Sequence, residues 1–393
     1  MTNFILHIGY GKTGTTAIQR FLHHNRTALA NAQTLYPDFF IHGAWLNAYN
    51  HNFLGRALAG RVGWWDQSAE QLIAQVEDQA RDAAADKVIL SAETFLGGIE
   101  PLDFDDEADY RLACRTAVER TARALGSHMV EIIVYLRRQD QWLESVLNQN
   151  IKYSGLLPRK LAKASIAETC RIYEPRLNYA ASLDPWRASF GKEAVTVGVY
   201  ERTQLSGGDV VADFRKRAGL DKLSLTTPAW DATTANRGLH RDVLEVKKIL
   251  NRISRPKFEE RALVESMYRV SEALSAHNRG MSASILSAEA RRAIVESVAE
   301  SNKVVAREYL LRFDGVLFRE ALPDSAADSR DYAGLDIGVA VEVLLRLERD
   351  LKSRRGRARL FRHWLGEQLR NVFPRLHGMV RRLQAAALGT RRE

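Results

Sequence analysis

The sequence predicts a doubly wound α/β fold, in which helices flank a parallel β-sheet and a helical extension follows at the C-terminus. The first observation is a set of four short apolar runs rich in β-branched residues, which are typical of buried parallel strands. The second is that helical patterns separate these runs, as the crossovers of a parallel sheet require. The predicted strands are Phe4–Ile8, Val88–Leu90, Glu131–Leu136 and Val195–Tyr200.

Strand signals fade after Thr203, and the remaining apolar patterns are helical over 242–251, 259–276 and 288–311. A polar stretch, Leu322–Tyr332, is typical of a linker. We therefore expect one α/β domain over residues 1–325, followed by a basic helical extension over residues 333–393.

The composition excludes several protein classes. Hydrophobic residues make up 46% and charged residues 27% of the 393-residue chain, so a large core can form and disordered or collagen-like chains are excluded. Two cysteines, Cys114 and Cys170, are too few for a disulfide scaffold or a zinc site. We expect both to be reduced and no metal site.

The net charge of +9 comes from one end of the chain. Residues 351–393 contain twelve Lys and Arg and two Asp and Glu, so this segment carries +10 and the first 350 residues carry −1. Basic charge confined to a tail does not suit a nucleic-acid-binding body. The tail itself interleaves arginine with Leu, Phe and Trp, which fits peripheral contact with an anionic membrane, nucleic acid binding, or a solvated helix packed on the body.

The start of the chain, MTNFILHIGYGKTG, has no basic segment before an apolar one, and no run approaches the roughly 18 apolar residues of a membrane span. A cytoplasmic protein is the expectation.

The segment Gly9–Thr16 follows the first strand and opens a helix. Backbone N–H groups converge at such a turn, and Lys12 adds a cation, so the loop suits an oxyanion. A dinucleotide fingerprint would also need an acidic residue about 20 positions later, and Asp38 lies in LYPDFF without a strand before it. A Walker A loop would need glycine where Leu6 stands. Neither the second nor the third strand ends in the aspartate that an NTPase uses to hold Mg²⁺.

The stretch HIGYGKTGTTAIQRFL resembles the 5′-phosphosulfate-binding loop of sulfotransferases that use 3′-phosphoadenylyl sulfate (PAPS). The resemblance implies a P-loop NTPase-like fold, PAPS as co-substrate, and no metal. It assigns the 5′-phosphosulfate to Gly11, Lys12, Thr13, Gly14, Thr15 and Thr16.

A second half of the family pattern also matches. The family binds the 3′-phosphate through an arginine after a later strand and a serine eight residues on, and here Arg137 and Ser145 hold these positions. Further similarity, including SAETF after the second strand, extends the resemblance over roughly Phe4–Phe318. The chain departs from the family at NRGL, where Gly238 stands in place of a serine.

The transfer needs a base for the acceptor hydroxyl. Glu93, at the end of VILSAE, lies where the family keeps a catalytic His or Glu, and His51 is the alternative. Lys12 would neutralise charge on the leaving phosphate. We expect the acceptor to be a carbohydrate or glycolipid hydroxyl, because Trp45, Trp64 and Trp65 stand among polar residues. Clustered aromatic residues also form cores, which is the alternative for these three. A P-loop kinase or NTPase, or a non-catalytic nucleotide- or nucleic-acid-binding protein, remains the alternative.

Overall fold

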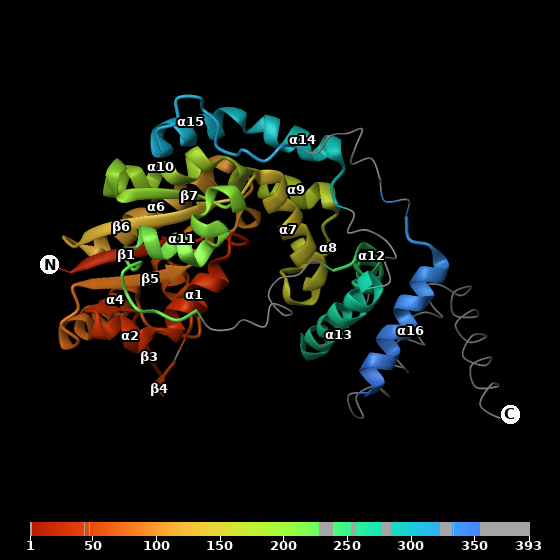
Figure 1. Ribbon diagram of the computed structural model, residues 1–393, viewed down its shortest axis with the longest axis horizontal. Coiled ribbons are helices and arrows are strands. Elements are labelled where there is room, and N and C mark those ends of the chain that lie inside the picture. Colours follow the sequence, from red (N-terminus) through yellow and green to blue (C-terminus); the bar gives the residue numbers. More distant parts are fainter. Residues whose placement is uncertain are drawn as a thin grey trace. The chain divides into compact units, whose positions relative to one another are not determined.

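A computed structural model of the protein contains a five-stranded parallel sheet flanked by helices (Figure 1), as the sequence predicts. The structure describes residues 2–42, 44–46, 48–227, 239–252, 257–276, 284–322, 332 and 334–353. The strand order is β2-β5-β1-β6-β7. These strands are β1 (Asn3–Ile8), β2 (Thr34–Leu35), β5 (Lys87–Ala92), β6 (Met129–Leu136) and β7 (Val195–Val199).

The four predicted strands correspond to β1, β5, β6 and β7, with ends within two residues of the expected ones. The sequence did not predict β2, because a two-residue edge strand is too short to form an apolar run. It also missed a small antiparallel hairpin of β3 (Phe40–Ile41) and β4 (Ala44–Trp45).

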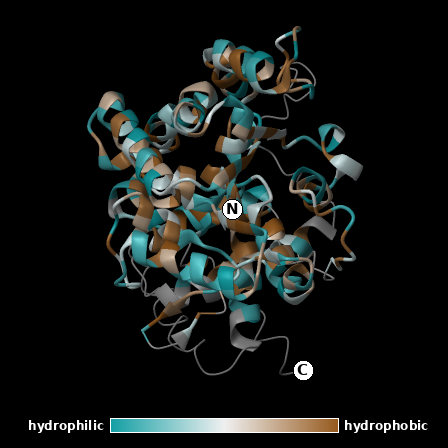
Figure 2. Cartoon of the chain, turned by 90° about the vertical axis from the view of Figure 1, so that its left-hand side faces the viewer, coloured by the Kyte–Doolittle hydropathy of each residue, from teal (hydrophilic) through white to brown (hydrophobic). Residues whose placement is uncertain are grey.

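Amphipathic helices flank the sheet, and brown and teal stretches occur together along them in Figure 2. Because crossovers between parallel strands are right-handed, the connection from β1 to β2 lies on one face, and those leading to β5, β6 and β7 lie on the other. Buried side chains of α1, α2 and α11 form one cluster with the sheet, whereas α6 packs with α3, α4 and α10. The helices that accompany the sheet are α1 (Thr15–His24), α2 (Arg26–Asn31), α3 (Asn52–Leu58), α4 (Ala69–Asp82), α5 (Thr94–Gly97), α6 (Glu107–Leu125), α9 (Ile166–Leu177), α10 (Tyr179–Phe190), α11 (Val210–Arg217), α14 (Ala288–Ser297) and α15 (Ala299–Leu310).

The sheet has a topological switch point between β1 and β6. The chain leaves β1 toward β2 on one side and leaves β6 toward β7 on the other. In open α/β sheets, ligands bind in the crevice outside the carboxyl ends of two such strands. The segments that follow Ile8 and Leu136 therefore border the expected ligand crevice.

Contacts divide the chain into two compact units. The first contains residues 1–143, 167–230 and 290–322 and includes the sheet; the second contains residues 144–166, 231–289 and 323–393. This division differs from the expected boundary between residues 325 and 333, because α12 and α13 share a core with α16. The second unit holds α8 (Arg159–Lys163), α12 (Arg241–Leu250), α13 (Lys257–Ala276) and α16 (Ile337–Ser353), and α7 (Gln139–Lys152) continues from the first unit into it.

Only the start of the expected C-terminal extension is described, as α16. The arginine-rich segment from residue 354 onward and the NRGL motif at Gly238 lie outside the described residues. Within the described ranges, no helix combines the length and the apolar character that crossing a membrane requires.

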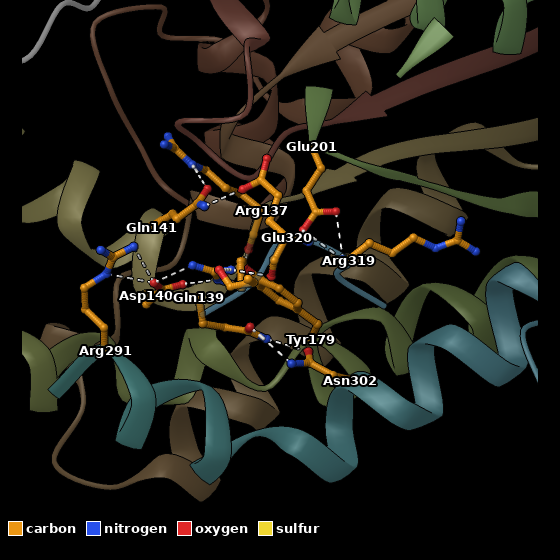
Figure 3. A network of polar contacts seen from close by, with 12 residues as sticks. Arg137, Gln139, Asp140, Gln141, Tyr179, Glu201, Arg291, Asn302, Arg319 and Glu320 are labelled. Atoms are coloured by element: carbon orange, nitrogen blue, oxygen red, sulfur yellow. Dashed lines mark hydrogen bonds and ion pairs between the residues drawn. The ribbon is translucent and has the colours of Figure 1, made fainter. Parts of the chain in front are cut away.

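A buried polar network fixes the junction of β6 and α7 (Figure 3). Arg138 Nε donates to Asp140 Oδ1 at 2.7 Å, and Arg291 Nε donates to Asp140 Oδ2 at 2.9 Å. Arg138 Nη1 also donates to the carbonyl oxygens of Glu320 and Ala321. These contacts hold α14 and the segment around Glu320 against the strand end that precedes α7.

The network predicts a loss of stability in acid. Burial alone would raise the pKa of Asp140, but hydrogen bonds and charge from Arg138 and Arg291 outweigh burial and hold this pKa below its ordinary value. The contribution of Asp140 to stability is therefore complete above the unfolded pKa of about 3.9 and is lost as the pH falls through the folded pKa.

We expect Asp140→Asn to lower the free energy of unfolding at pH 7 by about 3–5 kcal/mol, because the buried Arg138 guanidinium and the partly buried Arg291 guanidinium lose their counter-charge. Below pH 4 the difference from the wild type should shrink. Urea unfolding at a series of pH values measures both effects. Asp78→Asn is the control, since its pair with Arg81 is exposed; equal effects of the two substitutions would contradict this account.

Candidate functional site

The loop after β1 ends in an uncapped helix N-terminus. Gly14 is the N-cap of α1 and has a φ of 80°, and no side chain caps the helix. A Cβ on Gly14 would lie 2.7 Å from Val210 Cγ1, so only glycine fits this turn. The first N–H groups of the helix, at Thr15 and Thr16, have no preceding helical carbonyl to bind. The positive end of α1 is thus open to an anion.

Lys12 occupies the left-handed region, with a φ of 75°. A non-glycine residue there costs about 1–2 kcal/mol, so other contacts must hold the loop in this shape. Thr13 Oγ1 donates to the carbonyl oxygen of Tyr10 at 2.5 Å, and Trp142 Nε1 donates to that of Gly11 at 2.9 Å. Thr13 is fully buried, so its hydroxyl shapes the loop.

Arg137 follows β6 and lies beside the Lys12 loop. Its Nη1 donates to the carbonyl oxygen of Lys12 at 3.3 Å. Its Nε donates to Gln141 Oε1 at 3.4 Å, and its Cζ lies 5.8 Å from the centre of the Tyr200 ring. Tyr179 Oη donates to the Arg137 carbonyl oxygen at 2.5 Å (Figure 3). The two predicted anion-binding groups therefore come together across the β1–β6 crevice.

The electrostatics of this crevice favour a bound anion. Burial lowers the pKa of the Lys12 ammonium, the Glu93 carboxylate raises it, and the Arg137 guanidinium lowers it again. Burial also lowers the pKa of Arg137. Two partly buried cations beside a positive helix end repel each other, and an anion between them would relieve that repulsion.

Glu93 faces the same loop from the neighbouring strand end. It follows β5 directly, and its Oε1 accepts a hydrogen bond from Thr15 Oγ1. Its Oε2 lies 3.5 Å from the place where a Cβ on Gly11 would stand. A carboxylate here can accept a proton from a hydroxyl group that approaches the loop.

His51 does not fit the role of the alternative base. The ring is fully buried, its Nδ1 accepts the Ser91 N–H at 3.1 Å, and its Nε2 donates to the Pro37 carbonyl oxygen at 3.2 Å. Both ring nitrogens are therefore occupied, and neither can take a proton from an acceptor. The sequence could not reveal this, because burial of a lone histidine depends on the packing around it.

Ser145 lies on α7, in the part of that helix that belongs to the second unit, and is half-buried. Its role as a partner of Arg137 stays a prediction. Of the three tryptophans considered for the acceptor, Trp65 is core, whereas Trp45 and Trp64 are 58% and 57% exposed.

Several residues that bind Arg137 or the Lys12 loop were not predicted from the sequence. Gln141 could have been found, because it stands four residues after Arg137 and side chains at that spacing meet on a helix. Tyr179 is far in sequence from its partner Arg137, and Trp142 is far from its partner Gly11, so no spacing in the sequence indicates either contact.

A cavity of about 50 Å³ lies next to the loop, where Gly9, Tyr10 and Gly11 form part of its wall. Residues of α5, α6 and α10 contribute most of the remaining lining, together with Trp142 of α7 and Arg176 of α9.

Comparison with known proteins gives little further information. No protein-family model and no solved structure matches the chain. A stretch of 97 residues is 31% identical to an uncharacterized protein of Archaeoglobus fulgidus. The match covers 25% of this chain and 24% of that protein, and it names no activity.

The burial of His51 predicts that its ring stays neutral between pH 5 and pH 8. Burial, with a smaller effect of the Arg26 charge, lowers the pKa of His51 to about 3, against the opposing effect of the Pro37 hydrogen bond. Long-range ¹H–¹⁵N NMR of the imidazole groups should show a Nε2-protonated ring with constant shifts over this range. A midpoint near pH 6.5 would restore His51 as a candidate base.

Proposed function

We propose that the protein is a sulfotransferase with a P-loop NTPase-like fold, and that it transfers a sulfuryl group from PAPS to a hydroxyl group. The observation that carries the proposal is the contact between Arg137 and the carbonyl oxygen of Lys12. It brings together two anion-binding groups that come from different strands and that the resemblance assigns to opposite ends of one nucleotide.

The residues fit a nucleotide with phosphate groups at both ends. The open N–H groups at Thr15 and Thr16, with Lys12 beside them, suit the 5′-phosphosulfate. Arg137 Nη1 and Nε have acceptors in the protein, and its planar guanidinium can still bind a 3′-phosphate through its remaining N–H groups. Ser145 is the proposed second donor to that phosphate.

The chemistry follows from the same residues. PAPS supplies an activated sulfuryl group; the acceptor oxygen forms a bond to sulfur while the bond from sulfur to the 5′-phosphate oxygen breaks. Glu93 takes the acceptor proton, and Lys12 stabilises the negative charge on the leaving phosphate oxygen. Thr15 orients the Glu93 carboxylate through its hydroxyl group.

The acceptor in this proposal is a carbohydrate or glycolipid hydroxyl, and the exposed faces of Trp45 and Trp64 are compatible with a sugar. We place the protein in the cytoplasm, with peripheral membrane contact through the basic tail and no nucleic acid partner. A P-loop kinase or NTPase is the second candidate, because the uncapped N-terminus of α1 would also suit the phosphates of a nucleoside triphosphate.

Calorimetric titration with 3′-phosphoadenosine 5′-phosphate (PAP) tests the proposal. We expect Lys12→Ala and Arg137→Ala each to weaken binding about 10–100-fold, since each removes hydrogen bonds to a charged group worth about 1.5–3 kcal/mol. Arg137→Ala should also abolish the preference for PAP over AMP. The controls are Lys192→Ala and Arg187→Ala, which remove a lysine and an arginine that pair with Glu308.

Two results would overturn the proposal. The wild-type protein would give no heat with PAP, or it would bind AMP as tightly as PAP. Tight ATP binding with no preference for a 3′-phosphate would favour the kinase or NTPase instead.

A further inference from the structure

The segment His51–Asn52 runs beside the end of β5 and binds it through four hydrogen bonds. The His51 N–H donates to the Ser91 carbonyl oxygen at 3.0 Å, and the Ser91 N–H donates to His51 Nδ1 at 3.1 Å. One step further along, the Glu93 N–H donates to Asn52 Oδ1 at 2.9 Å. Thr94 Oγ1 donates to the Asn52 carbonyl oxygen at 2.6 Å. The Asn52 side chain therefore binds the backbone of the proposed base itself.

This segment is held firmly in turn. Asn50 Oδ1 accepts the Asn52 N–H at 3.2 Å, and His51 Nε2 donates to the Pro37 carbonyl oxygen. The His51 ring packs against Tyr36, with 4.6 Å between ring centres. Asn52 Oδ1 is thus a fixed acceptor and not the end of a mobile loop.

Helix α3, which begins at Asn52, presses directly on the turn that carries Glu93. A Cβ on Gly55 would lie 2.8 Å from the Thr94 carbonyl carbon and 2.9 Å from the Phe95 nitrogen. The absence of a side chain at Gly55 lets the helix backbone approach that closely. The position of α3 therefore determines where the turn at Glu93 lies.

We infer that Asn52 is a positioning residue for Glu93, an inference that rests on the proposed function. The β1–β5 ladder continues one residue past β1 and reaches the last residue of β5, because the Gly9 N–H donates to the Ala92 carbonyl oxygen at 3.2 Å. Glu93 is the next residue, and Asn52 Oδ1 binds its N–H where no neighbouring strand supplies an acceptor. This bond keeps the carboxylate directed at Thr15 and Lys12. Without this bond the nucleotide still binds, but the Glu93 carboxylate is displaced and takes the proton of the acceptor hydroxyl more slowly.

The test compares Asn52→Ala with Asn52→Asp, which keeps an oxygen able to accept the Glu93 N–H. Three quantities are measured: PAP affinity by calorimetry, release of labelled sulfate from PAPS to water, and amide hydrogen exchange of the peptide containing Glu93. We expect Asn52→Ala to bind PAP within about threefold of wild type, to turn over at least tenfold more slowly, and to exchange faster at Glu93. Asn52→Asp should recover most of the turnover and the slow exchange.

Two control variants give the turnover against which Asn52→Ala is compared. Glu93→Gln gives the turnover that remains without the base, and Ser68→Ala removes a side-chain acceptor of a backbone N–H at the start of α4, away from Glu93. Ser68→Ala should leave turnover unchanged. Wild-type turnover in Asn52→Ala, or an equal loss in Asn52→Ala and Asn52→Asp, would overturn the inference alone. Failure of the wild-type protein to bind PAP would overturn the proposed function and this inference with it.

Discussion

The parallel pairing of β1 with β6 is the constraint on which the candidate site depends. His7 lies opposite Ile133 in this register, so the two strands end at the same edge of the sheet. Because the chain leaves these strands in opposite directions, neither connection covers the crevice between their ends. The Lys12 loop and Arg137 come from residues 125 positions apart, yet one hydrogen bond joins them.

The site combines several features that cost free energy, and hydrogen bonds around it offset that cost. Lys12 is strained, α1 has no side-chain cap, and two partly buried cations lie close together. Around them, hydrogen bonds hold the loop and the strand end: Trp142 donates from α7, Tyr179 from α10 and Thr13 from within the loop. Backbone strain and closely spaced cations are typical of a binding site, since a ligand can relieve them. An anion bound here would therefore stabilise the folded protein as well as occupy the site.

The sequence predicted the parts of the fold and site whose signals are local. The four long strands are continuous apolar runs, and the Gly9–Thr16 loop combines glycine, lysine and threonine at a strand end. Arg137 could be placed because it directly follows a strand. By contrast, the unpredicted strand β2 has only two residues, and the second unit forms because α12, α13 and α16 share a core across a long sequence separation.

His51 and Asn52 show the same limit within the site. A histidine in a loop suggests chemistry, but both of its nitrogens bind backbone groups of distant segments. Its neighbour Asn52 carries no motif, yet its side chain binds the backbone of Glu93. Whether a polar residue acts on a substrate or supports another residue depends on contacts between segments far apart in sequence, which spacing alone does not encode.

A crystal structure of the protein with PAP would show directly whether one nucleotide spans the ends of β1 and β6. We expect one nucleotide across the β1–β6 crevice, with its 5′-phosphate on the N–H groups at the start of α1 beside Lys12 and its 3′-phosphate on Arg137. A nucleotide bound elsewhere, or one that touches the Lys12 loop while its 3′-phosphate points away from Arg137, would contradict this expectation.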